Sequence, residues 1–107
     1  MPYHIRAWEL YLSGRGVDPA ALNSRMHGKH NDVLIREFFG AHLDDAEVRA
    51  MGEAKEAIYR DLVGPELEAA LVPGIRSFLA ETPAYAKAVA SNAEPRNVNF
   101  VLAAAQL

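Results

Sequence analysis

Ser91 and Asn92 carry the strongest local signal for chemistry, because they follow an apolar run of strand length, residues 86–90, and precede a helix expected from about Pro95. A hydroxyl at the end of a strand, beside the free backbone N–H groups of a helix start, forms an anion site. The same two residues can instead do no more than cap the helix. Their spacing leaves both interpretations open.

Lys55 is the second candidate, since it lies on or beside the apolar face of a long helix expected over residues 44–62. Val48, Met51 and Ile58 mark that face. A lone cation is unexpected there and could serve a binding site. The alternative is a lysine whose stem covers apolar surface while its ammonium reaches water.

The histidines and carboxylates carry less information. His27 and His30 are close enough to share a metal ion, but no third ligand stands near them, which favours solvated loop histidines. Asp18, Asp32 and Asp44 all stand where helices are expected to begin, which predicts helix capping. The sequence has no Asp-x-Asp pair and no glycine-rich phosphate loop.

The composition excludes several classes of function. The 107 residues are about one domain's worth of chain, half of them apolar and 23% charged, as in soluble globular proteins. Acidic residues number 14 and basic residues 11, without a basic block, so nucleic acid is not an expected partner. The absence of cysteine excludes disulfides and thiolate chemistry. No apolar stretch reaches the roughly 20 residues of a membrane span and no signal peptide is visible, so we expect a cytoplasmic protein without a membrane partner.

Helical periodicity dominates the first part of the chain. It predicts helices over residues 3–13, 18–26, 31–39 and 44–62. Gly40 is the expected stop of the third helix, and Asp44 lies three residues before Glu47 in an arrangement that resembles a capping box. Helices joined by such short connections predict a small antiparallel bundle.

The pattern changes near Gly64-Pro65. A helical turn is expected over residues 66–71 and a short helix from Ile75, followed by the strand at 86–90 and the last helix. Helix–strand–helix is typical of an α/β sheet. The expected fold is therefore mainly α, with a helical-bundle domain over 1–71 followed by a partial α/β, Rossmann-like segment over 72–107.

Short motifs follow one another in a definite order: Tyr3-His4-Ile5-Arg6-Ala7-Trp8, Met26-His27-Gly28-Lys29, the pair Lys55 and Tyr59, Val72-Pro73-Gly74-Ile75, and Ala90-Ser91-Asn92. This ordered set resembles the haloacid dehalogenase superfamily, in particular the branch that contains β-phosphoglucomutase and its phosphatase relatives. In that family the first motif follows the catalytic Asp-x-Asp-Gly loop, a helical cap comes next, and the last motif is a strand that ends in Ser or Thr. The resemblance covers essentially the whole chain.

The resemblance implies a role for each matched residue. Ser91 would bind the transferring phosphate, and Asn92 would lie beside it. His4, at the hinge of the cap, would approach the active site, and Lys55 would face the cleft from the cap. The cap loop that selects the substrate would contain His27, Gly28 and Lys29.

The family's nucleophilic Asp, its general-acid Asp, its third-motif Lys and its acidic Mg²⁺ ligands have no counterpart in this sequence. We therefore expect a fragment of a phosphohydrolase, inactive alone, with no catalytic and no metal-binding residue of its own. The complete enzyme would use Mg²⁺ and an aspartyl-phosphate to hydrolyse a small phosphorylated metabolite. Asn31 and His27 stand where the mutase branch has Arg and Lys, which favours a phosphatase over a mutase.

A non-catalytic helical module is the alternative. The lone strand at 86–90 and the apolar stripe after Pro95 both need partners. A homodimer that pairs these strands or swaps helices would supply them, as would another protein.

Overall fold

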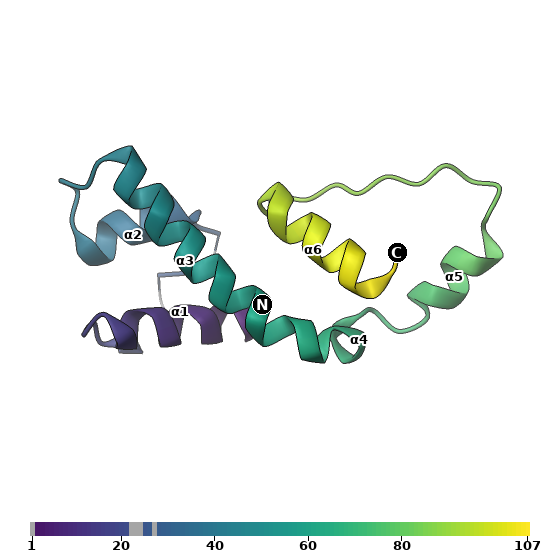
Figure 1. The fold of residues 1–107 in the computed structure, drawn as a ribbon, viewed down its shortest axis with the longest axis horizontal. Coiled ribbons are helices and arrows are strands. Elements are labelled where there is room, and N and C mark those ends of the chain that lie inside the picture. Colours follow the sequence, from purple (N-terminus) through teal and green to yellow (C-terminus); the bar gives the residue numbers. More distant parts are fainter. Residues whose placement is uncertain (1, 22–24, 27) are drawn as a thin grey trace. The chain divides into compact units, whose positions relative to one another are not determined.

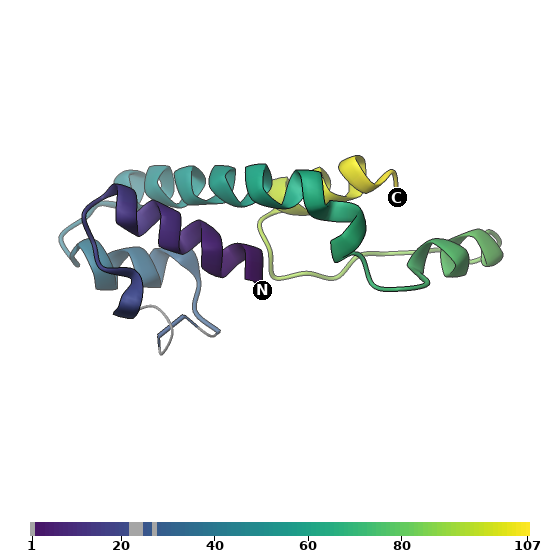
Figure 2. The same cartoon turned by 90° about the horizontal axis from the view of Figure 1, so that it is seen from below.

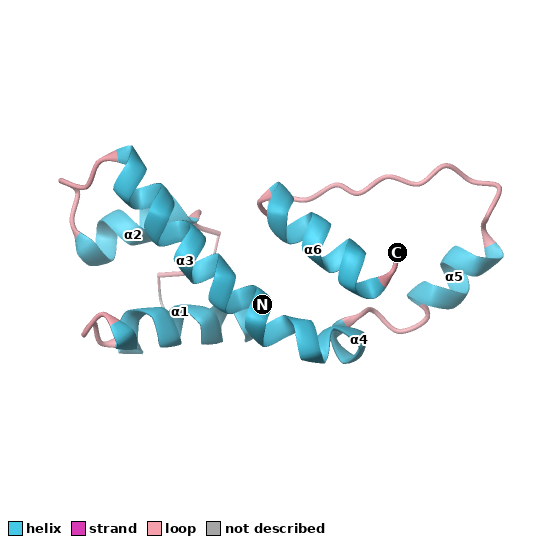
Figure 3. Ribbon diagram, in the orientation of Figure 1, coloured by secondary structure: helices cyan, strands magenta, loops and turns pink. Residues whose placement is uncertain are grey.

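The computed structural model describes residues 2–21, 25–26 and 28–107. These residues form helices joined by loops, and no strand occurs among them (Figure 3). The chain divides into two compact units, which we call unit 1 (Met1–Leu62) and unit 2 (Val63–Leu107). The division falls earlier in the chain than the boundary at 71–72 expected from the sequence. Within the described ranges, no helix is both long enough and apolar enough to cross a membrane.

The helices of unit 1 reproduce most of the predicted pattern. α1 and α3 lie side by side and run in opposite directions (Figures 1 and 2), and α2 precedes α3 along the chain. The predicted helix over 31–39 is confirmed, with its stop at Gly40, whose N–H donates to the carbonyl of Arg36. The elements are α1 (Pro2–Gly14), the 3₁₀ turn η1 (Pro19–Ala21), α2 (Asn31–Phe39) and α3 (Asp45–Val63).

A capping box starts α3. The Glu47 N–H donates to Asp44 Oδ1 at 2.7 Å, and the Asp44 N–H donates to Glu47 Oε2 at 3.0 Å. This reciprocal pair satisfies backbone donors that the first helical turn leaves without partners. The predicted capping role of Asp44 is confirmed, whereas Asp32 lies inside the first turn of α2 rather than at its N-cap.

The helix predicted over 18–26 is wrong in its extent. Asp18 Oδ1 accepts the Ala20 N–H at 2.9 Å and starts only the short turn η1. Arg25 and Met26 are not helical, and residues 22–24 lie outside the described part of the chain. An aspartate that bonds two residues ahead stabilises a local turn as readily as a helix, so the cap signal did not determine how long the helical segment would be.

The core of unit 1 lies between the three α-helices. It contains Trp8 and Leu12 from α1, Leu34 and Ile35 from α2, and Val48 from α3. These residues recur at helical spacing, so each helix turns one apolar stripe inward. The same helix faces carry His4, one turn before Trp8 on α1, and Lys55, two turns after Val48 on α3.

Unit 2 is built from shorter elements. Its Arg76 ties three of them together, because the guanidinium donates to the Glu68 carboxylate at 2.6 and 2.8 Å and to the Ala105 carbonyl at 2.8 Å. Gly74, with a positive φ of 83°, makes the turn that leads into α5. The elements are η2 (Gly64–Glu66), α4 (Leu67–Ala70), α5 (Ile75–Glu81) and α6 (Pro95–Ala105).

The strand predicted at 86–90 is wrong for this structure. These residues run as exposed chain between α5 and α6, drawn as a loop in Figure 3. A strand needs a neighbour to pair with its backbone N–H and C=O groups, and the described residues supply none. The fold is mainly α, as expected, but the α/β segment is not formed.

Candidate functional site

Lys55 lies inside unit 1, with only 2% of its side chain exposed. Its ammonium donates to Glu56 Oε1 at 2.8 Å, and the Glu56 side chain is 5% exposed. The ammonium therefore does not reach water, and the interpretation of Lys55 as a lysine that extends to the surface is wrong. Two buried charges are costly to desolvate and persist only when they are paired and hydrogen-bonded.

His4 of α1 meets Lys55 although the two residues are 51 positions apart in the sequence. Its Nδ1 lies 3.1 Å from Lys55 Nζ. The His4 ring also stacks on Tyr59, with centroids 3.9 Å apart and planes 4° from parallel. Lys55 and Tyr59 are four residues apart on α3, so they share the helix face that meets α1.

Asn31, the first residue of α2, completes the arrangement. Its Nδ2 donates to Glu56 Oε1 at 2.7 Å, while Glu56 Oε2 lies 3.9 Å from His4 Nδ1. We call His4, Asn31, Lys55, Glu56 and Tyr59 the buried cluster. All three α-helices of unit 1 contribute to it, so its geometry depends on the packing of the whole unit.

The electrostatics of the cluster keep His4 neutral. Burial lowers the pKa of His4 to about 4, and the positive charge of Lys55 acts in the same direction while Glu56 opposes it. Burial, followed by the charge of Glu56, raises the pKa of Tyr59. At neutral pH the cluster thus holds one cation, one anion, a neutral imidazole and a neutral phenol.

The arrangement can bind and orient a ligand, but it offers no activated nucleophile. His4, with 30% of its side chain exposed, is the member of the Lys55–Glu56–His4 triad that a ligand can reach. Lys55 and Glu56 lie beside it in the interior of unit 1. Trp8 borders the same charged groups, with its ring centroid 5.2 Å from Lys55 Nζ.

The residues that the resemblance assigns to a cap loop are not brought into the buried cluster. Lys29 is paired on the surface of unit 1, where its Nζ lies 2.7 Å from Glu37 Oε1. Gly28 is an exposed turn residue with a φ of 75°. His27 lies outside the described residues.

Ser91 and Asn92 belong to unit 2 and are exposed. Ser91 Oγ accepts the Ala93 N–H at 3.0 Å, which closes a turn ahead of α6. The helix itself begins at Pro95, with Glu94 as its N-cap. Ser91 is therefore separated from the helix N-terminus by a turn, and neither the expected strand end nor the alternative role of capping α6 is formed.

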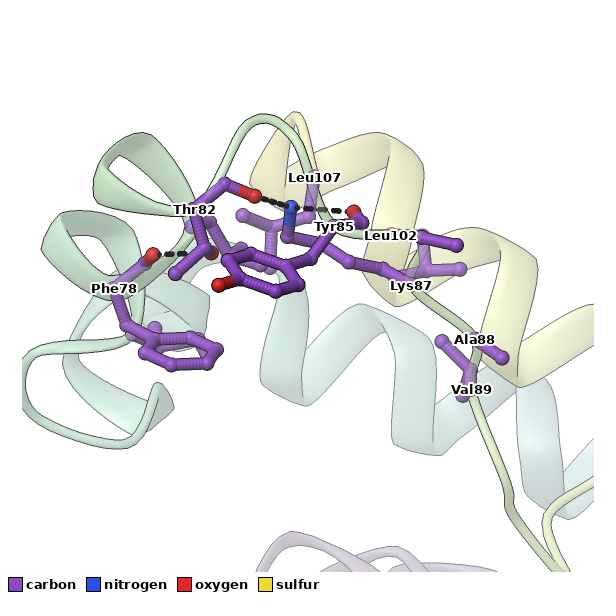
Figure 4. Close-up of a pocket in the computed structure, with 11 residues that line it drawn as sticks. Phe78, Thr82, Tyr85, Lys87, Ala88, Val89, Leu102 and Leu107 are labelled. Carbon is purple, nitrogen blue, oxygen red and sulfur yellow. Dashed lines mark hydrogen bonds between the residues drawn. The ribbon is translucent and has the colours of Figure 1, made fainter.

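Unit 2 also contains an apolar hollow of about 890 Å³ (Figure 4). Lys87 crosses its rim and donates to the carbonyls of Thr82 and Tyr85. The aliphatic stem of Lys87 and the rings of Phe78 and Tyr85 give the hollow an apolar lining, which suits an apolar ligand or surface. We refer to it as the apolar hollow; its walls are Ile75, Phe78, Leu79, Thr82, Tyr85, Ala86, Lys87, Ala88, Val89, Leu102 and Leu107.

The described residues do not fit a Mg²⁺ site. Nowhere among them do three or more His, Asp or Glu side chains gather as a metal would require. Ligands for the Mg²⁺ that the resemblance implies would have to come from elsewhere.

No protein-family model, no curated protein and no solved structure matches the chain.

Proposed function

We propose that this chain is part of a haloacid dehalogenase-like phosphohydrolase that acts on a small phosphate monoester. One observation carries the proposal: His4 Nδ1 and Lys55 Nζ, from two separate motifs of the resemblance, lie 3.1 Å apart. Tyr59, which belongs to the same motif as Lys55, stacks on His4. A chance match of short motifs gives no reason for these three side chains to meet in one buried cluster.

In this proposal the buried cluster forms the cap side of the active site, where His4 contacts the substrate. Ser91 and Asn92 bind the transferring phosphate. Residues 86–90 become a strand when the other strands of a complete core lie beside them and satisfy their backbone groups. The nucleophilic Asp and the Mg²⁺ ligands come from chain that is not part of this sequence. The absence of cysteine fits a cytoplasmic enzyme.

The test begins with the DNA on both sides of this coding region. The proposal expects an in-frame Asp-x-Asp-Gly just upstream, and a Lys and an acidic pair downstream. The protein encoded by the whole reading frame should hydrolyse at least one member of a panel of phosphate monoesters with Mg²⁺, and an Asn in place of the first Asp should abolish that activity. Stop codons close on both sides, or a full-length protein without activity on the panel, would overturn the proposal.

Self-association is a second candidate function, and the apolar hollow favours it. Val72, Phe78, Tyr85 and Val89 are all more than half exposed on unit 2, an unusual concentration of apolar side chains for a small monomer. The extended segment 86–90 can pair with its own copy across a two-fold axis, which would cover both the backbone and the hollow. We therefore assign a second copy of this chain as the occupant.

Light scattering across a hundredfold range of concentration tests this candidate. The mass should rise to that of a dimer, and Val89→Asp should return it to that of a monomer. Glu81→Gln, which changes an exposed charge on α5, should leave the dimer intact. A monomeric mass at every concentration contradicts self-association.

A further inference from the structure

The contact between Lys55 and His4 determines which ring nitrogen of His4 carries a proton. A lysine ammonium has three donors and no acceptor, so the nitrogen at 3.1 Å from it must accept. A neutral imidazole has one acceptor and one donor nitrogen. Since Nδ1 accepts from Lys55, the proton of His4 lies on Nε2.

The charge on Lys55 is itself held in place. Glu56 Oε1 accepts from Lys55 Nζ at 2.8 Å and from Asn31 Nδ2 at 2.7 Å, so the carboxylate is fixed from two helices. With the carboxylate this close, the ammonium is the favoured state of Lys55 even though it is buried. The stacked Tyr59 ring fixes the plane of the imidazole.

We infer that Lys55, held by Glu56 and Asn31, locks His4 in the neutral tautomer protonated on Nε2, and that His4 thereby serves as a hydrogen-bond donor to an acceptor oxygen of a ligand. Lys55, Glu56 and Asn31 are positioning residues that act through His4. Because 30% of the His4 side chain is exposed, its Nε2–H can donate to a ligand. Because the Nδ1 lone pair is occupied, His4 is not a general base.

The chemistry of the ligand follows from the same geometry. That the ligand is a phosphate ester, and that the acceptor oxygen lies on its leaving-group side, rests on the proposed function. The donor role of His4 does not. The paired charges of Lys55 and Glu56 cancel, so the cluster has no net charge with which to hold a second phosphate. A neutral donor with no net charge behind it best suits an uncharged acceptor, such as a hydroxyl, ether or carbonyl oxygen of the substrate.

NMR on the ¹⁵N-labelled 107-residue chain tests the tautomer without any substrate. Long-range ¹H–¹⁵N correlations at pH 7 should show His4 with its proton on Nε2, the signals being assigned by their loss in His4→Gln. A proton on Nδ1, or an imidazolium, in the wild-type chain overturns the inference. Neither result depends on phosphatase activity, so failure here is distinct from failure of the proposed function.

Lys55→Met separates positioning from simple packing. It should release His4 into a mixture of tautomers and raise its pKa from about 4, though not to 6.5, because burial remains the larger cause of the shift. The positive N-terminus of the chain also lowers this pKa and is unchanged in the variant. Glu56→Gln should lower the pKa further, and Lys87→Met, in unit 2, should leave the His4 signals where they were. Unchanged His4 signals in a folded Lys55→Met chain contradict the assigned role; if that variant does not fold, the wild-type tautomer alone decides.

Discussion

His4 Nδ1 lies 3.1 Å from Lys55 Nζ, and the imidazole is held in this position by a ring stack on Tyr59, one turn further along α3. The relationship joins the start of α1 to the middle of α3. It places an uncharged imidazole beside a buried cation whose counter-charge is the neighbouring Glu56. The packing of unit 1 and the electrostatics of the buried cluster therefore depend on the same few contacts.

The stability of the chain should fall with acid between pH 6.5 and about 4. The pKa of His4 is about 4 in the folded chain and 6.5 as its ordinary value, so in this window the unfolded chain binds the additional proton. Stability is full above pH 6.5 and declines as the pH falls, by roughly 2 kcal/mol at pH 4 after allowance for partial exposure. Urea denaturation at a series of pH values measures it. His4→Gln should remove this part of the pH dependence, and an equal slope in that variant would assign the effect to other groups.

Lys55→Met should destabilise the chain by about 3 kcal/mol, because it leaves the Glu56 carboxylate buried without its cation. Lys55→Met combined with Glu56→Leu removes both charges, and we expect it to be at least about 1 kcal/mol more stable than the single variant. Arg36→Met breaks the exposed pair with Asp45 and should cost about 1 kcal/mol or less. Chemical denaturation of the variants provides the comparison. A double variant less stable than Lys55→Met would mean that Glu56 stabilises the unit through contacts other than Lys55.

Helix boundaries that depend on neighbouring residues were predicted correctly. Gly40 ends α2 because its φ of 125° suits glycine alone, and the Asp44–Glu47 pair starts α3, so both boundaries could be read from neighbouring residues. The strand at 86–90 could not be predicted in the same way. An apolar run becomes a strand only beside a partner, and the run contains no information on whether that partner is present.

The candidate site was predictable only where a single residue gave a local signal. Lys55 stood out because a cation on an apolar face is anomalous, but the sequence did not reveal which groups would surround it. Glu56 follows Lys55 directly, and neighbouring positions on a helix point about 100° apart, so a buried face at Lys55 does not imply that Glu56 is buried as well. The Glu56 side chain is nevertheless buried, and Asn31 reaches it from α2. Such tertiary partners have no signature at fixed sequence spacing.

Gly52→Ala should stabilise the chain by about 0.5–1 kcal/mol, because glycine in the middle of a helix carries an entropic cost relative to alanine. An added Cβ would meet Ile35 Cδ1 at 3.7 Å and Asn31 Cβ at 3.8 Å, which is ordinary van der Waals contact. Gly40→Ala is the opposite case, since its Cβ would lie 2.5 Å from the His42 ring at a φ of 125°. Thermal unfolding should shift upward for the first variant and downward for the second. A destabilised Gly52→Ala would show that α2 and α3 pack more tightly than these distances indicate.

Asp44→Ala should cost about 1 kcal/mol by removing the acceptor for the Glu47 N–H at the start of α3. The buried cluster lies further along α3, at Lys55 and Tyr59, so the loss should be concentrated at the start of the helix. Glu47→Gln is the matched variant, since an amide oxygen can still accept the Asp44 N–H and little stability should be lost. Hydrogen exchange of the amides in the first turn of α3 should accelerate in Asp44→Ala and stay near the wild-type rate in Glu47→Gln. Equal protection in Asp44→Ala and wild type would show that packing of α3 against α1 and α2, rather than its cap, determines where the helix begins.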